Sequence, residues 1–261
     1  MKPTAPIAIQ LQCVCHDTLP WRISFSLDHM NQFRSMLPRL AQLYDRFVTG
    51  SVDNFFHGFP NRLRSQDSVT FKFYRGVESW LSFVPAVEWD YYAQKVGQTV
   101  LLCDRPRKRF WEQLHDVLNE ALGVKVLRSE FGCDIVRFVR PAAGSRIPDL
   151  FGQSVSINHY LEVKTVNHSQ DERESWYRED NPTHSDKMPK LLKTKIKSSY
   201  LEAVDQLRSP NDAASARKIV LLVLNPDYYF APADIPVADV VYSYLATIEQ
   251  PHFPIHCHIY S

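Results

Sequence analysis

The chain has 261 residues, of which 44% are hydrophobic and 23% charged, and its formal net charge is +1. These values are typical of a globular protein whose core needs no disulfide. The five cysteines are an odd number and the N-terminal segment lacks a secretory apolar run, so we expect reduced thiols and a cytoplasmic location. No apolar run approaches the roughly 20 residues of a membrane span, which excludes a membrane protein.

Residues 1–100 predict an N-terminal α+β region. The segment AIQLQCVCHD (8–17) alternates like a half-buried strand, and apolar residues from Met30 to Phe47 recur at helical spacing, with Pro38 bending or breaking the helix. Residues 51–100 are rich in aromatics and are interpreted as short strands and loops. We expect this region to provide specificity or to bind a partner.

Residues 101–261 predict a second domain of α/β class. A helix over 109–123 ends at Gly123, and four strand-like runs follow: 124–130, 134–140, 146–152 and 159–166. A polar insertion, 167–189, precedes a helix over 193–209 and the apolar strand KIVLLVLN (218–225). Because that strand is apolar throughout, we expect it inside the sheet with both faces covered.

Three charged residues lie inside the predicted strands: Asp149, Glu162 and Lys164. Side chains two residues apart in a strand share a face, so Glu162 and Lys164 project together while Val163 faces the core. If the two strands form a hairpin, Asp149 lies across from Glu162, and two neighbouring carboxylates repel unless a cation lies between them. Hard oxygen ligands favour Mg²⁺ or Mn²⁺. Lys164 would orient the attacking water, assist its deprotonation through a lowered pKa, or neutralise phosphate charge.

Pro148-Asp149 and Glu162-Val163-Lys164 resemble the motif of the PD-(D/E)XK nuclease superfamily, to which many restriction endonucleases belong. The resemblance covers residues 105–225 and implies a restriction-endonuclease-like core of helix, mixed central sheet, helix and strand. It further implies that Asp149, Glu162 and the Val163 carbonyl bind the metal. An additional acid from the first helix falls on Glu112, with Glu120 as the runner-up, and a glutamine of some branches falls on Gln206.

Two basic clusters flank this motif in sequence and are candidates for nucleic-acid binding. They comprise Arg105, Arg107, Lys108 and Arg109, and Lys187, Lys190, Lys193, Lys195 and Lys197. The insertion between motif and second cluster carries Trp176 and Tyr177, which offer faces for base stacking. Both clusters are equally interpretable as solvated surface, and the insertion as a loop without a role.

Cysteine and histidine also recur near both ends, in CVCH (13–16) and HCH (256–258). Zinc is less well supported than packed strand residues, because Cys257 points away from His256 and His258 and neither segment has the ligand spacing of a turn. His115, three residues beyond Glu112, is a candidate to face the site, but a place on the helix surface is the better interpretation.

The sequence therefore predicts a Mg²⁺-dependent (or Mn²⁺-dependent) endonuclease acting on DNA, of restriction, phage-defence or repair type, with RNA as an alternative substrate. Catalysis would depend on Asp149, Glu162, Lys164 and Glu112. The alternative is a nucleic-acid-binding or complex-assembly module that has the fold without turnover. A homodimer or a protein partner bound through residues 1–100 fits either hypothesis.

Overall fold

The computed structural model describes residues 27–63, 65–66, 68–103, 111–140, 147–155, 157–167, 190–208, 216–224, 237–250 and 252–259. Its helices are α1 (Leu27–Met36), α2 (Pro38–Phe47), α3 (Phe59–Arg62), α4 (Val69–Leu81), α5 (Ala86–Thr99), α6 (Glu112–Ser129), α8 (Lys190–Arg208) and α9 (Val237–Ile248). Its strands are β1 (Ile135–Phe138), β2 (Leu150–Gln153), β3 (Asn158–Val166), β4 (Arg217–Leu224) and β5 (Ile255–Ile259).

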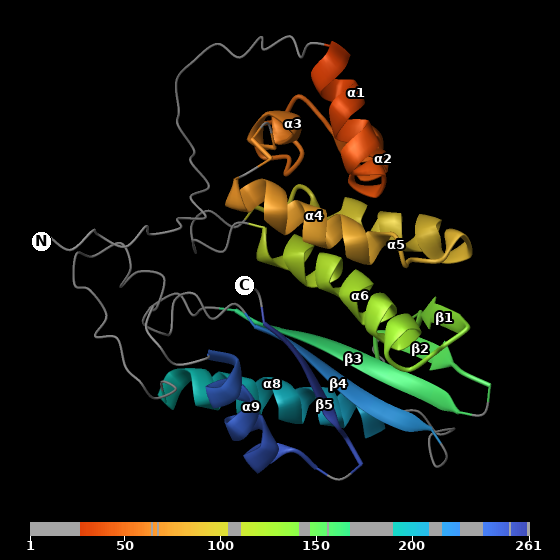
Figure 1. Cartoon of the computed structure of the whole chain (residues 1–261), viewed down its shortest axis with the longest axis vertical. Helices are drawn as coiled ribbons and strands as arrows, with labels where there is room; N and C mark the ends of the chain where they lie inside the picture. Colours follow the sequence, from red (N-terminus) through yellow and green to blue (C-terminus); the bar gives the residue numbers. More distant parts are fainter. Residues whose placement is uncertain are drawn as a thin grey trace, which may run out of the picture.

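The five strands form one mixed sheet in the order β1-β2-β3-β4-β5. Strands β1, β2 and β3 pair antiparallel, whereas β3, β4 and β5 pair parallel. Helix α6 covers one face, and α8 and α9 cover the other (Figure 1). The expected α/β class is therefore confirmed.

Strand β4 is covered on both faces, as its apolar sequence predicts. Its residues alternate between two separate clusters of buried side chains: Ile219, Leu221 and Val223 pack with the α6 side, while Val220, Leu222 and Leu224 pack with α8 and α9. The alternation follows from the two-residue period of a strand. Because both faces need apolar side chains, the strand reads as a continuous hydrophobic run.

Helix α6 differs from the prediction at its C-terminal half. It does not end at Gly123 but continues to Ser129, so the strand expected over 124–130 is wrong. A Cβ at Gly123 would lie 2.6 Å from Leu150 Cδ1 and 3.0 Å from Val163 Cγ2. Glycine is present because the helix backbone approaches the sheet closely there, not because the helix terminates. The valines that suggested a strand are buried against the same sheet.

Residues 51–100 are also different from the prediction of short strands and loops, since their described part contains helices α3, α4 and α5. Three aromatic residues of α4, Phe71, Tyr74 and Trp80, lie in the core. The strand expected over 8–17 lies outside the described residues.

The break at Pro38 is confirmed. Helix α1 ends at Met36 and α2 begins with Pro38, whose missing N–H is no loss at a first helical position. The Glu78 carboxylate of α4 caps α2, because its two oxygens accept hydrogen bonds from the backbone N–H groups of Arg39 and Leu40, both at 2.9 Å. This buried cap fixes α2 against α4.

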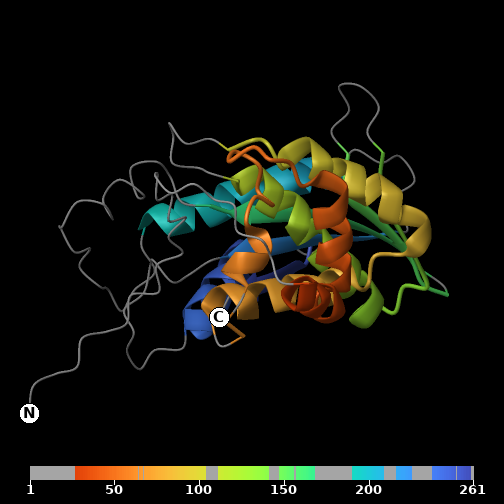
Figure 2. The ribbon, with the colours of Figure 1, turned by 90° about the horizontal axis from the view of Figure 1, so that it is seen from above.

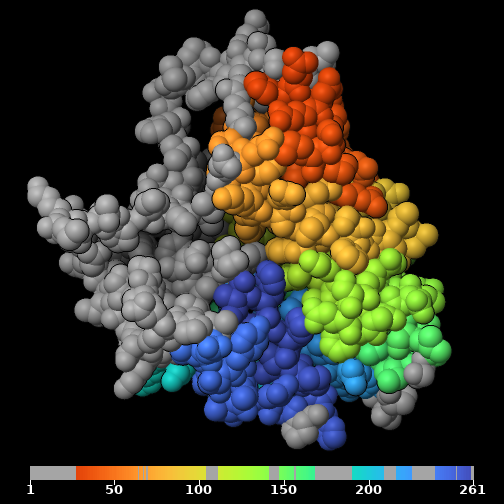
Figure 3. Space-filling view, in the orientation of Figure 1, coloured from red at the N-terminus to blue at the C-terminus, as the bar shows by residue number. Residues whose placement is uncertain are grey.

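The N-terminal helices and the sheet share a core. One cluster of buried apolar side chains runs from Phe33 of α1 through α4, α5 and α6 to Val223 of β4. Viewed from above, these helices lie over the sheet (Figure 2), and their surfaces adjoin that of α6 in the space-filling view (Figure 3). Helix α5 is thereby held against α6.

Among the described helices, none is both long and apolar enough to span a membrane.

Candidate metal centre

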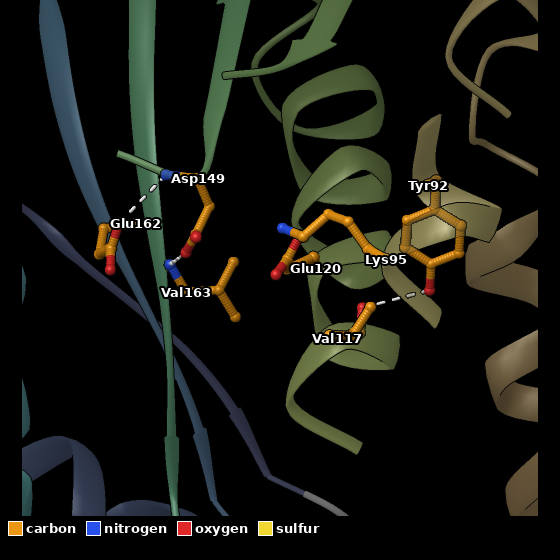
Figure 4. A network of polar contacts seen from close by, with 7 residues as sticks. All are labelled: Tyr92, Lys95, Val117, Glu120, Asp149, Glu162 and Val163. Carbon is orange, nitrogen blue, oxygen red and sulfur yellow. Dashed lines mark hydrogen bonds and ion pairs between the residues drawn. The ribbon is translucent and has the colours of Figure 1, made fainter. Parts of the chain in front are cut away.

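The hairpin of β2 and β3 brings Asp149 and Glu162 together. Its register ends at the pair Leu150–Leu161, so Asp149 lies immediately beyond the paired part, opposite Glu162. The Asp149 N–H donates to Glu162 Oε2 at 3.1 Å, and Asp149 Oδ2 accepts from the Val163 N–H at 2.9 Å. Both contacts are drawn in Figure 4. The Asp149 side chain thus caps the edge of β3 where β2 ends.

Lys164 lies on the same face of β3 as Glu162, toward α8. Its Nζ is 3.2 Å from Glu162 Oε1 and donates to Glu202 Oε1 on α8 at 3.1 Å. The side chain of Glu162 is 2% exposed, that of Lys164 is 17% exposed and that of Glu202 is 65% exposed. The opposite face of β3 carries Leu161 and Val163, which pack toward α6. The face assignment made from the strand period therefore holds.

A third carboxyl group approaches from α6. Glu120 is buried, and its Oε2 is 2.5 Å from Nζ of Lys95 on α5. In Figure 4, Glu120 lies between Lys95 and the strand that carries Val163, on the side of that strand where the Asp149 side chain lies. Glu112, the acid favoured from the sequence, begins α6 and lies eight residues earlier, about 12 Å along the helix axis. The structure brings Glu120 to this site and does not bring Glu112 there.

The carboxyl groups are held in a setting that disfavours their charge. Burial, and then the neighbouring Asp149, raise the pKa of Glu162 to about 9. The same two causes raise the pKa of Glu120 to about 8. Burial also raises the pKa of Asp149 itself, against the opposing effects of the Val163 N–H, Lys95 and Lys164. Burial and mutual repulsion therefore favour the protonated forms of these carboxyl groups.

The same surroundings favour the charged form of the two lysines, Lys95 and Lys164. Burial lowers the pKa of Lys164, but Glu162 and Glu202 outweigh it and the pKa is raised overall. The pKa of Lys95 is raised in the same way, because Glu120 outweighs the effect of burial. Lys164 is therefore an ammonium in this structure. The lowered pKa that would let it deprotonate water is not found, whereas its roles as a charge and a hydrogen-bond donor are retained.

The donor set fits a hard divalent cation. Asp149 and Glu162 supply carboxylate oxygens, and the Val163 carbonyl points to the same edge of β3 as its N–H, toward Asp149. Mg²⁺ typically takes one or two carboxylates and keeps several waters. Within the described residues, no cluster of three or more Asp, Glu, His or Cys side chains forms a ready metal site. The remaining ligands would therefore be main-chain and water oxygens.

Sequence reasoning missed three charged residues of this region: Lys95, Glu202 and Asp116. Asp116 accepts from Asn167 Nδ2 at 3.3 Å, near the end of β3. Asp116 and Glu120 are four residues apart and so share one face of α6, a pattern that was visible in the sequence. Lys95 and Glu202 gave no such signal, because each comes from an element far from the motif in sequence.

The predicted nucleic-acid ligands are only partly described. Arg105, Arg107, Lys108 and Arg109 lie outside the described residues, as do Lys187, Trp176, Tyr177 and the rest of the insertion 168–189. On α8, Lys190 and Lys197 are exposed, and Lys193 packs over the Tyr244 ring at 5.6 Å. Lys195 Nζ donates to the Asn167 carbonyl at 3.0 Å, which directs it toward the end of β3.

Gln206 lies on α8, nine residues beyond Lys197, and is half-buried, with Oε1 lacking a hydrogen-bond partner among the described residues. The terminal histidines pack rather than cluster: His256 Nε2 is 3.2 Å from Glu130 Oε2, and His258 lies against Trp80. Cys257 is buried on the opposite face of β5, and the segment 13–16 lies outside the described residues. His115 is half-buried rather than fully on the helix surface: its ring packs against Phe55 and Phe73, and burial lowers its pKa to about 4.

No protein-family model, no curated protein and no solved structure matches this chain. The interpretation of the site therefore depends on its own geometry and on the motif in the sequence.

Proposed function

We propose that the protein is a metal-dependent nuclease that hydrolyses phosphodiester bonds of DNA. The order α6, β1 to β3, α8, β4 supports a restriction-endonuclease-like core, because it matches the helix, mixed sheet, helix and strand that the motif implies. The observation that carries the proposal is the placement of Asp149 between Glu162 and the Val163 main chain, with the Lys164 ammonium on Glu162.

This arrangement of buried carboxyl groups lowers the stability of the fold. Two carboxyl groups with raised pKa values lie together where β2 ends beside β3, a place where apolar residues would pack without desolvation cost. Perturbed groups of this kind are concentrated at functional sites. The cluster is therefore better explained by chemistry than by stability.

Asp149, Glu162 and the Val163 carbonyl would hold the cation. When bound, Mg²⁺ would supply charge stabilisation for the attacked phosphate and acidify a coordinated water. Lys164, as an ammonium, would donate hydrogen bonds to a phosphate oxygen or to the attacking water and would neutralise charge there. Glu120 adds a third carboxyl group on the α6 side of the site, and Lys95 holds that group in place.

The test is cleavage by the purified chain and by its Lys164→Ala variant. Each is incubated with supercoiled, linear, single-stranded and branched DNA and with RNA, in the presence of Mg²⁺, Mn²⁺ or a chelator. We expect cleavage of DNA that requires the metal and falls by about 10²-fold or more in the variant, a typical loss for one charge-stabilising donor.

Lys72→Ala is the matched control, since it removes an exposed lysine of α4, outside both basic clusters, with the same change of charge. Full activity in Lys164→Ala would refute the proposal. DNA binding without cleavage by the unmodified chain under every metal condition would instead favour a binding or assembly module.

A further inference from the structure

The Lys164 ammonium contacts two carboxyl groups that differ in their surroundings. Glu162 Oε1, at 3.2 Å, belongs to a side chain that is 2% exposed, whereas Glu202 Oε1, at 3.1 Å, belongs to one that is 65% exposed. Glu162 thus approaches Lys164 from the protein interior, and Glu202 approaches it from the solvent side.

The two contacts also differ in strength. An exposed ion pair contributes only about 0.2–1 kcal/mol, so an incoming anion can displace Glu202 at small cost. The contact with Glu162 is fixed by burial and by the Asp149 N–H bonded to its other oxygen. A competing anion would therefore exchange with Glu202 and leave Glu162 in place.

The face of α8 that carries Glu202 is otherwise suited to a phosphate backbone. Lys195 lies seven residues before Glu202, two helical turns away and on the same face, and its Nζ reaches the Asn167 carbonyl just beyond β3. Glu202 places a negative charge on this same face, at the solvent side of Lys164, the half-buried lysine that would contact the phosphate in the proposed mechanism.

We propose that Glu202 is a positioning residue that takes the place of a substrate phosphate on Lys164 in the free protein. Its carboxylate orients the ammonium toward solvent and yields that place to a phosphodiester oxygen when DNA binds. The inference depends on the proposed function, since it takes DNA as the anion that Lys164 meets. It assigns α8 a part in the site beyond its surface lysines.

The test is binding of a fluorescent DNA duplex of about 20 base pairs, measured by anisotropy in a chelator so that no cleavage occurs. We expect Glu202→Gln to tighten binding by about 2- to 5-fold, the worth of one exposed ion pair that no longer has to be broken. Asp205→Asn, which removes another exposed carboxylate three residues further along α8, is the matched control and should give a smaller change. Thermal unfolding of each variant checks that it is folded.

The double variant Lys164→Met with Glu202→Gln decides between a specific contact and a general effect of charge. We expect the Glu202→Gln gain to vanish when Lys164 is absent. The inference is overturned if the gain persists there, if Asp205→Asn gives an equal gain, if Glu202→Gln changes nothing, or if no form binds DNA. The nuclease proposal is decided separately by metal-dependent cleavage, so an absence of cleavage together with the expected binding pattern would refute the function alone.

Discussion

Replacing Glu162 by glutamine separates the energetic cost of the site from its proposed use. Glu162 is 2% exposed, and its two oxygens face the Asp149 N–H and the Lys164 ammonium. Glutamine has nearly the same shape but carries no charge at any pH. The variant therefore keeps the packing of the hairpin while it removes the group that ionises.

The magnitude follows from the pKa of Glu162, which is about 9 in the folded chain against an ordinary value of 4.5. At pH 7 the folded state keeps a proton that the unfolded state has released, which costs the wild-type protein about 3 kcal/mol of stability. The glutamine amide, facing Lys164 as a second donor, costs about 1–2 kcal/mol. Glu162→Gln should then be more stable than wild type by about 1–2 kcal/mol at pH 7 in a chelator.

The sign of this difference should change with pH. Because the folded pKa is the higher one, wild-type stability falls as pH rises from 4.5 toward 9, while the variant has no such contribution from this position. At pH 5 the wild-type cost is below about 1 kcal/mol, so the variant is the less stable protein, and at pH 8 its advantage exceeds that at pH 7.

Urea unfolding of both proteins at pH 5, 6, 7 and 8, in a chelator and again with Mg²⁺, measures this difference. Glu202→Gln, which removes the exposed carboxylate beside the same lysine, is the control for the loss of a charge at this position. Mg²⁺ should stabilise the wild type most at pH 8 and should leave Glu162→Gln unchanged. A stability difference between wild type and Glu162→Gln that stays constant from pH 5 to pH 8 would refute the reasoning.

Two further variants test the packing around the site by urea unfolding. Gly123→Ala should destabilise the protein by about 1–3 kcal/mol, because its Cβ would meet Leu150 and Val163 at 2.6 and 3.0 Å. The control is Gly76→Ala in α4, whose Cβ meets nothing within 4 Å and which should stabilise the protein by about 0.5–1 kcal/mol. Equal effects of the two substitutions would contradict the close approach of α6 to the sheet at Gly123. Lys95→Met should lower the free energy of unfolding by about 3 kcal/mol, since it leaves the buried Glu120 carboxyl group without its partner. Adding Glu120→Gln to this variant should restore most of the lost stability. A double variant no more stable than Lys95→Met alone would show that the loss of the Lys95–Glu120 pair is not the cause.

Local pattern was sufficient to predict the hairpin. Alternation along 159–166 assigned Glu162 and Lys164 to one face and Val163 to the other, and the structure has that arrangement. The continuous apolar run of β4 likewise predicted its place inside the sheet. Both predictions hold because the strand period is a property of the backbone and does not depend on what packs against it.

The sequence failed where the same local signal suits two structures. The valines at 124 and 126 favour a strand by propensity, yet their burial against the sheet is met equally well by a helix. Gly123 fits both a helix end and a close contact, and only the position of Leu150 decides between them. The aromatic residues of 51–100 gave no clear period, because side chains on several faces of α4 and α5 are covered by neighbouring helices.

The amino-acid sequence by itself determined the elements that carry Asp149, Glu162 and Lys164 and the faces on which two of them lie. Only the tertiary structure decided that Glu120 rather than Glu112 approaches them, and that Lys95 from α5 and Glu202 from α8 complete the charge balance. The physical reason is that backbone periodicity fixes which side chains of one element share a face. The partners of a buried charge are instead chosen by how separate elements pack, and that depends on the whole core.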